Sequence, residues 1–178
     1  MVHNETLILG IGNTLLSDEG AGIHALNQIQ SSYPDLSSVE FLDGGTLSFT
    51  LASWIEDCKN LIVLDAAELN QPAGTVRMFE GLEMDHFLGT SKHSAHEVGL
   101  LDLMDIARIT EHLPQHRALI AIQPQKMDWG MQPTVPVQAA LELAAQKAYQ
   151  LICQWQRVEE STESDSCSPE SSSIKVLN

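Results

Sequence analysis

Short, continuous apolar runs alternate along the chain with longer segments in which apolar residues recur every three or four positions. Continuous runs of about four to eight apolar residues are typical of strands buried on both faces of a sheet, whereas the wider spacing is typical of helices that present one face to a core. The strands predicted in this way cover 6–11, 39–42, 61–64 and 118–122, and the predicted helices cover 18–31, 47–57, 96–109 and 135–156.

Strands that alternate with helices pair in parallel through right-handed crossovers. A further segment, 75–80, follows Pro72-Ala73-Gly74 and is predicted to be a short strand that reverses direction near one edge of the sheet. The fold class is therefore predicted to be α/β: a three-layer sandwich in which a mostly parallel, twisted sheet of about five strands has helices on both faces.

The last predicted helix has the clearest signals of all. Thr134 is expected to be its N-cap, Pro136 suits its first turn, and an apolar stripe continues to Trp155. After Arg157 the chain becomes acidic and rich in Ser, with too few apolar residues to offset the entropy of ordering. We therefore predict one domain over 1–157 and a flexible acidic tail over 158–178.

Charge and hydropathy narrow the range of partners. The 178 residues include 24 acidic and nine basic side chains, for a net charge of −15, and the basic residues are scattered along the chain. The sequence has no cluster of basic residues that could contact the phosphate backbone of a nucleic acid, so a nucleic-acid partner is not expected. The longest apolar runs fall far below the ~20 residues of a membrane span, and no Lys or Arg precedes Lys59, so the expected location is the cytoplasm.

The conventional nucleophiles of hydrolases are not signalled. Cys58, Cys153 and Cys167 show no C-x-x-C spacing and are odd in number, which argues against a thiolate metal site and a disulfide framework. The chain also lacks a G-x-S-x-G sequence and a Cys beside a His. A hydrolase built on this sequence would have to activate water through a metal ion or a carboxylate.

A glycine turn followed by an acidic pair ends the first predicted strand. Gly10 and Gly12 suggest a dinucleotide fingerprint, but Leu15 stands where the third glycine belongs. The next helix then begins with Asp18-Glu19, and two carboxylates at that place repel phosphate and attract a cation. Asp18 is expected to serve the helix start, which leaves Glu19 as the candidate ligand.

Two more carboxylates leave the same edge of the predicted sheet. Asp43 ends the second strand and Asp65 ends the third. Ligands of open parallel sheets bind outside the carboxyl ends of the strands, so Glu19, Asp43 and Asp65 are candidates for one site. Each also has a structural alternative: an acid in a first helical turn complements the helix dipole, and an Asp after a strand often stabilises a turn.

A nitrogen ligand is available from the segment His93-Ser94-Ala95-His96-Glu97. Ser94 and Glu97 form a capping box that predicts a helix beginning at Ala95, with His96 in its first turn. The positive end of a helix opposes protonation and so favours the neutral imidazole that binds metals. The alternatives are a surface role for His96 and ligation by His93 instead.

The sequence from His96 onward begins like the H-E-x-x-H signature of zinc proteases. Leu100 stands where the second histidine belongs, which rules out that assignment. Glu19, Asp65 and His96 would together supply two oxygens and one nitrogen. This donor set suits a borderline divalent ion such as nickel or zinc.

With these residues considered, the chain resembles the hydrogenase maturation proteases, the endopeptidases that trim the large subunit of nickel-iron hydrogenases. The likeness extends over about 5–156, including Pro124 and Pro133-Thr134-Val135, and leaves out the acidic tail. Four segments look like the family's motifs: Gly10-Ile11-Gly12-Asn13-Thr14-Leu15-Leu16-Ser17-Asp18-Glu19-Gly20, Asp43-Gly44-Gly45-Thr46, Leu64-Asp65-Ala66 and Ser94-Ala95-His96-Glu97-Val98-Gly99-Leu100.

The resemblance implies a twisted sheet with helices on both sides and metal contacts at Glu19, Asp65 and His96. It also implies removal of a C-terminal extension from the nickel-iron hydrogenase large-subunit precursor after nickel insertion, with the nickel supplied by that precursor. Peptidase classifications place the family with the aspartic-type endopeptidases. Asp43, beside the flexible Gly44-Gly45, is our candidate for orienting water or substrate, with a turn residue as its alternative.

Two other classes of function are considered for this sequence. A non-enzymatic nickel metallochaperone, or a checkpoint protein that senses bound nickel, would need the three ligands and no catalytic group. A nucleotide-binding α/β domain is disfavoured by Leu15 and the acidic turn.

Overall fold

The computed structural model of the chain describes residues 5–36, 38–90 and 95–166, and within these ranges it omits the side chains of 95–98 and 159–166. Five strands form one sheet in the order β2-β1-β3-β5-β4. Their bounds are Thr6–Gly10 (β1), Val39–Asp43 (β2), Asn60–Ala66 (β3), Val76–Glu80 (β4) and His116–Ile122 (β5).

Four strands are parallel, and only β4, at one edge, is antiparallel to its neighbour. The reversed edge strand predicted over 75–80 is therefore confirmed. The chain passes from β1 to β2 on one side and then crosses to β3 on the other side of β1. The carboxyl ends of β1 and β3 thus form the topological switch point, which is where open α/β sheets hold their ligands.

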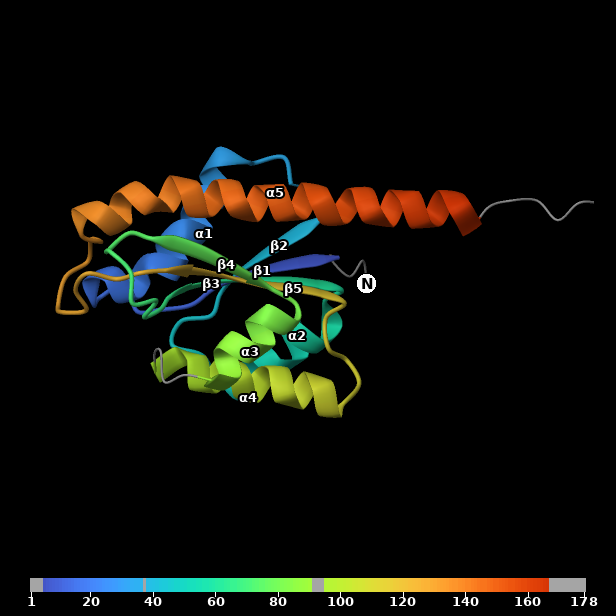
Figure 1. Cartoon of the computed structure of the whole chain (residues 1–178), viewed down its shortest axis with the longest axis horizontal. Coiled ribbons are helices and arrows are strands. Elements are labelled where there is room, and N and C mark those ends of the chain that lie inside the picture. Colours follow the sequence, from blue (N-terminus) through green and yellow to red (C-terminus); the bar gives the residue numbers. More distant parts are fainter. Residues whose placement is uncertain (1–4, 37, 91–94, 167–178) are drawn as a thin grey trace, which may run out of the picture.

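Helices cover both faces of the sheet, as predicted for a three-layer sandwich (Figure 1). On one face lie α1 (Ala21–Ser32) and the long α5 (Val135–Ser166), which pack against each other. The other face carries three helices, α2 (Ala52–Asp57), α3 (Leu82–Thr90) and α4 (Ala95–Ile109). Two short 3-10 turns, η1 (Ser17–Gly20) and η2 (Phe49–Leu51), lead into α1 and α2.

The alternation of side chains along β3 divides the core into two clusters. All seven residues of β3 are buried. Ile62 and Leu64 belong to the cluster under α1 and α5, whereas Leu61 and Val63 belong to the cluster under α2, α3 and α4. Successive side chains of a strand point to opposite faces, so Asp65 points toward the α4 side.

Two elements differ from the sequence prediction. Helix α3 was not predicted, because Met84 and Leu88 are its only buried residues and Gly89 lowers its helical propensity. Helix α5 continues past Arg157 to Ser166, so the start of the predicted tail at 158 lies inside this helix. Extending an existing helix needs no new nucleation step, because the packed part of α5 already provides the helical nucleus. Residues 167–178 lie outside the described part.

In the described parts of the chain, no helix has the length and apolarity needed to cross a membrane.

Candidate functional site at the carboxyl edge of the sheet

The glycine turn after β1 lets later segments approach the strand ends closely. Gly12 has a φ of 138°, and a Cβ built on it would lie 1.9 Å from the carbonyl oxygen of Glu19. A Cβ at Gly22, in the first turn of α1, would lie 2.2 Å from the carbonyl oxygen of Leu64. The two glycines therefore allow close backbone packing, and the Glu19 turn lies against β3.

Two backbone amides at the start of this turn donate hydrogen bonds within the protein. Ile11 N donates to Leu64 O at 2.9 Å, and Gly12 N donates to Gly45 O at 2.8 Å. A phosphate-binding loop would instead direct such amides toward its ligand. The hydrogen bonds thus agree with the rejection of a nucleotide site.

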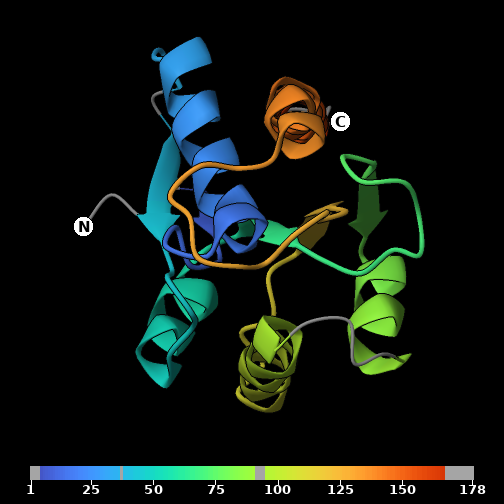
Figure 2. The same cartoon turned by 90° about the vertical axis from the view of Figure 1, so that its left-hand side faces the viewer.

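Glu19 and Asp65 both lie at the switch point. Glu19 is partly buried in η1, which contacts β3, and Asp65 is the penultimate residue of β3 with a relative exposure of 1%. Figure 2 looks onto this edge and shows the turn before α1 beside the ends of the central strands. The structure therefore brings the segments that carry two of the predicted ligands to one place.

Helix α4 begins at Ala95, as predicted, which puts His96 in its first turn. The start of α4 faces the same edge: a Cβ at Gly99 would lie 3.4 Å from Cδ1 of Leu47, just after β2. The side chain of His96 lies outside the description, as do residues His93 and Ser94. Ligation by Glu19, Asp65 and His96 together therefore stays a prediction.

Among the side chains that the structure describes, no group of three or more His, Cys, Asp or Glu residues is arranged to hold a metal ion. The set searched does not include His96.

Asp43 is the last residue of β2 and pairs in register with Gly10 of β1. Its side chain is exposed, and its Oδ1 accepts a hydrogen bond from Gly45 N at 2.9 Å. This bond closes a local turn in which Gly45 has a φ of 52°. The turn-stabilising alternative is thus present, and a catalytic role for Asp43 stays a prediction.

Asp18 has a different role from the one expected. Its side chain is fully buried and does not cap a helix; it binds the loop between β5 and α5. Oδ2 accepts hydrogen bonds from Gln125 N, Lys126 N and Thr134 Oγ1 at 2.8, 3.0 and 2.8 Å, and Oδ1 accepts one from Thr134 N at 2.6 Å. The hydroxyl of Thr134, the expected N-cap of α5, is therefore directed to Asp18. Asp18 does lie in the first turn of η1, as predicted, but its carboxylate binds partners that are remote in sequence.

Gln123 is a second organising residue that the sequence did not reveal. It lies buried just beyond β5, where its Oε1 accepts from Leu69 N at 2.7 Å and its Nε2 donates to Glu68 Oε2 at 3.2 Å. These bonds join the loops that follow β3 and β5. With Asp18, Gln123 holds the backbone around the switch point.

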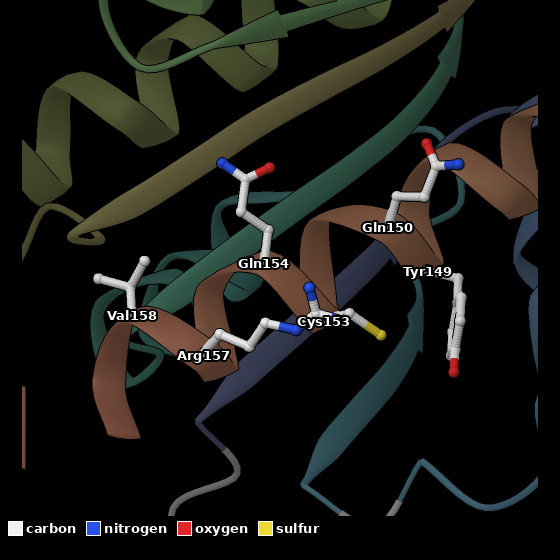
Figure 3. Close-up of a pocket in the computed structure, with 6 residues that line it drawn as sticks. All are labelled: Tyr149, Gln150, Cys153, Gln154, Arg157 and Val158. Atoms are coloured by element: carbon white, nitrogen blue, oxygen red, sulfur yellow. The ribbon is translucent and has the colours of Figure 1, made fainter. Parts of the chain in front are cut away.

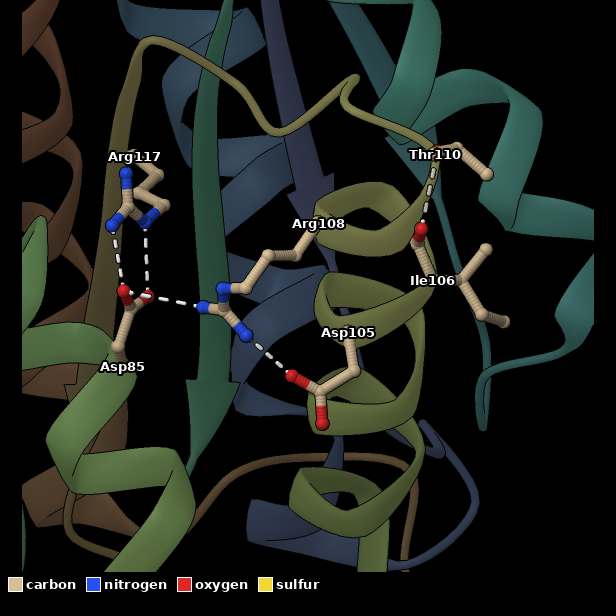
Figure 4. A network of polar contacts seen from close by, with 6 residues as sticks. All are labelled: Asp85, Asp105, Ile106, Arg108, Thr110 and Arg117. Carbon is tan, nitrogen blue, oxygen red and sulfur yellow. Dashed lines mark hydrogen bonds and ion pairs between the residues drawn. The ribbon is translucent and has the colours of Figure 1, made fainter.

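A polar network on the other side of the molecule fixes α3 to the sheet (Figure 4). Arg117 of β5 donates to both carboxylate oxygens of Asp85, at 2.9 and 2.6 Å, and Arg108 of α4 lies 3.3 Å from the same carboxylate and also pairs with Asp105. The hydrogen bonds from Arg117 are the main cause that lowers the pKa of Asp85. Arg117 lies near the start of β5, so this network is structural and separate from the carboxyl edge.

An open hollow on α5 also lies apart from the strand ends. Its six lining residues, Tyr149, Gln150, Cys153, Gln154, Arg157 and Val158, all belong to α5 (Figure 3). Tyr149 stacks on Tyr33 with ring centroids 4.1 Å apart. The other described cysteine, Cys58, is buried, and burial raises the pKa of its thiol to about 12. Cys167 lies outside the described residues, so the exclusion of a thiolate site stays a prediction.

Comparison with known proteins decides the family. The family model described as "Hydrogenase maturation protease" matches residues 23–151. The chain belongs to the hydrogenase maturation protease family. The resemblance carried by the four sequence motifs is therefore confirmed.

Individual family members are similar over most of their length. The "Hydrogenase expression/formation protein HupD" of Bradyrhizobium diazoefficiens is 33% identical over 153 residues, which cover 85% of this chain and 80% of that protein. The "Hydrogenase 2 maturation protease" of Escherichia coli is 34% identical over 142 residues, or 76% and 85% of the two chains.

Solved structures agree with the fold. The hydrogenase maturating endopeptidase HybD from E. coli superposes with a TM-score of 0.77 at 29% identity and covers 84% of this chain and 93% of that one. The [NiFe] hydrogenase maturation protease HybD from Thermococcus kodakarensis gives a TM-score of 0.71 at 28% identity over 83% and 98% of the chains. The α/β sandwich of this chain is thus the fold of the family.

Proposed function

We propose that this protease is the endopeptidase that removes the C-terminal extension of a nickel-iron hydrogenase large-subunit precursor after nickel insertion. The observation that carries the proposal is the meeting of the Glu19 turn and Asp65 at the β1–β3 switch point, with the first turn of α4 at the same edge. Membership of the family supports the same function.

Nickel enters this proposal as cargo of the substrate, held by the precursor. Carboxylate oxygens of Glu19 and Asp65 and an imidazole nitrogen of His96 are donors that a borderline divalent ion accepts. Three such donors from the protease would complete the coordination of an ion already held by the precursor. Recognition would then depend on nickel insertion, so that an immature precursor is not cut.

Peptide hydrolysis needs a positioned water, because the chain has no signature of a covalent nucleophile. Asp43 lies at the carboxyl end of β2, next to the end of β1, and its exposed carboxylate has one oxygen engaged by Gly45 N. We assign Asp43 the role of orienting water or the substrate at the scissile bond. The reaction consumes one water and yields a new C-terminal carboxylate and a released peptide.

Intact-mass spectrometry of the precursor tests the proposed activity. The purified chain is incubated with nickel-loaded large-subunit precursor, and the expected result is the loss of one C-terminal peptide. Binding without any mass change would contradict an endopeptidase and would favour the metallochaperone or checkpoint alternative.

Substitution of the three ligands tests the site. Glu19→Gln, Asp65→Asn and His96→Ala are each expected to abolish processing, because the first two replace a charged carboxylate with a neutral amide and the third removes the imidazole. The matched control is His93→Ala, which removes a nearby histidine in the preceding segment and is expected to have a much milder effect. An equal loss of cleavage in His93→Ala would show that the wrong histidine was chosen, and wild-type cleavage by any of the three would exclude that residue.

A further inference from the structure

Four exposed apolar residues lie in the turn after β1 and in the loop between β5 and α5, near the candidate site. Trp129 and Met131 are 83% and 69% exposed, and Leu15 and Met127 are 49% and 41% exposed. We call these four residues the edge surface. Exposure alone does not mark a docking site, because Phe49, Leu82 and Val135 are 70%, 81% and 84% exposed as well. The edge surface differs from these residues in its hydrogen-bonded attachment to the turn that carries Glu19.

Backbone hydrogen bonds hold the two segments of the edge surface side by side. Gly130 N donates to Leu15 O at 3.0 Å, Ser17 N donates to Gly130 O at 2.6 Å, and Ser17 Oγ donates to Asp128 O at 2.9 Å. A Cβ at Gly130 would lie 2.5 Å from Ser17 Oγ, so a larger residue there would displace the Ser17 hydroxyl from its bond to Asp128 O. The backbone of Leu15 is therefore held beside the loop that carries Trp129 and Met131.

Asp18 anchors the loop that presents this surface. Its buried carboxylate binds Gln125 and Lys126 before the exposed residues and Thr134 after them. A loop tied at both ends loses little further entropy when a partner binds, and an exposed Trp and Met pair offers a large, adaptable apolar contact. The edge surface is thus organised in advance of binding.

The edge surface is continuous with the proposed site. Leu15 lies in the same turn as Glu19, and Asp18 links that turn directly to the loop of Trp129. A polypeptide whose nickel-bearing part meets Glu19 would pass over these side chains. A second copy of the chain is a poorer occupant, because two bodies with a formal charge of −15 each would repel one another.

We propose that Leu15, Met127, Trp129 and Met131 bind an apolar segment of the substrate polypeptide beside the part that Glu19 reads. This inference rests on the proposed function and deepens it. Trp is the residue most enriched among binding hot spots, and Trp129 is the most exposed member of the surface, so it is expected to contribute most.

Processing kinetics and binding, measured with nickel-loaded large-subunit precursor, test the proposal. Trp129→Ala is expected to raise KM and the dissociation constant about 30-fold, which corresponds to about 2 kcal/mol, and to change kcat little. The matched control is Ile109→Ala, since Ile109 is 81% exposed at the far end of α4 and its loss is expected to leave both constants unchanged. Urea unfolding of both variants checks that each remains folded.

The outcomes separate this proposal from the proposed function. Cleavage by the wild-type chain with the same KM in Trp129→Ala would overturn the edge surface as a docking site and leave the function intact. Binding that Trp129→Ala weakens, without cleavage by the wild-type chain, would support the docking site and contradict the endopeptidase. A wild-type dimer in light scattering that Trp129→Ala dissociates, with KM unchanged, would assign the surface to self-association and overturn the proposal.

Discussion

Replacement of Asp18 is the most informative test of how the carboxyl edge is held together. The buried carboxylate accepts four hydrogen bonds, three of them from backbone amides of the loop between β5 and α5. Asp18→Asn keeps the size of the side chain but replaces one acceptor oxygen with a donor. The amide oxygen can occupy the place of Oδ2 and keep three bonds, and the new NH2 group then faces Thr134 N.

The magnitude follows from these contacts. Asp18→Asn loses one short charge-assisted hydrogen bond and places its NH2 group against another donor, Thr134 N. We expect it to lower the free energy of unfolding by about 2 kcal/mol. Asp18→Ala leaves all four donors without their acceptor. Because water can reach part of the exposed loop, the expected loss is about 3–5 kcal/mol and not the full sum of four desolvation terms.

Urea denaturation followed by circular dichroism measures these differences. The control is Asp128→Asn, on the same loop, where the carboxylate is 71% exposed and lies 3.4 Å from Lys126 Nζ. A surface pair of this kind contributes about 0–1 kcal/mol, so the control should unfold almost as the wild-type chain does. An Asp18→Asn midpoint equal to that of Asp128→Asn would refute the role assigned to Asp18.

Two further predictions concern the packing of α1 and the attachment of α3. Gly22→Ala forces a methyl group against Leu64 O and is expected to destabilise the fold by about 1–3 kcal/mol. The control Gly89→Ala, with open space around the added methyl group, should be neutral or slightly stabilising. Thermal unfolding compares the two variants, and equal melting temperatures would contradict the close approach at Gly22. Asp85→Asn tests the bond from Arg117: because the pKa of Asp85 is lowered in the folded state, its contribution is present above the unfolded pKa near 4 and is lost as the pH falls through the folded value. The difference in unfolding free energy between the wild-type chain and Asp85→Asn should therefore be full above about pH 5 and shrink as the pH falls below the unfolded pKa near 4, and a constant difference would contradict this assignment.

The sheet was predictable because its signals are local. Each strand is a short apolar run, and the parallel order follows from helices between strands. The start of α4 at Ala95 followed from the capping-box pattern in the sequence, and the structure begins the helix at that residue. Helix α3 was missed because it buries only Met84 and Leu88, with Phe87 partly buried beside them, and these are too few residues to establish a helical period.

The candidate site was predictable in part for the same reason. Glu19 follows β1, and Asp43 and Asp65 lie at the carboxyl ends of β2 and β3, so the topology alone brings their segments to one edge. The roles of Asp18 and Gln123 were not predictable, because they depend on partners far away in the chain: Asp18 lies 116 positions from Thr134, and Gln123 lies 54 positions from Leu69. A buried carboxylate and an exposed ligand look alike in sequence, and only tertiary contacts separate Asp18 from Glu19.

The central claim, that the protease reads nickel in its substrate, is tested most directly by the ratio of cleavage rates on matched nickel-loaded and nickel-free precursor. The account predicts that the wild-type chain releases the C-terminal peptide only from the nickel-loaded form, and that His96→Ala releases it from neither. Equal rates of cleavage of the two forms by the wild-type chain would contradict the claim.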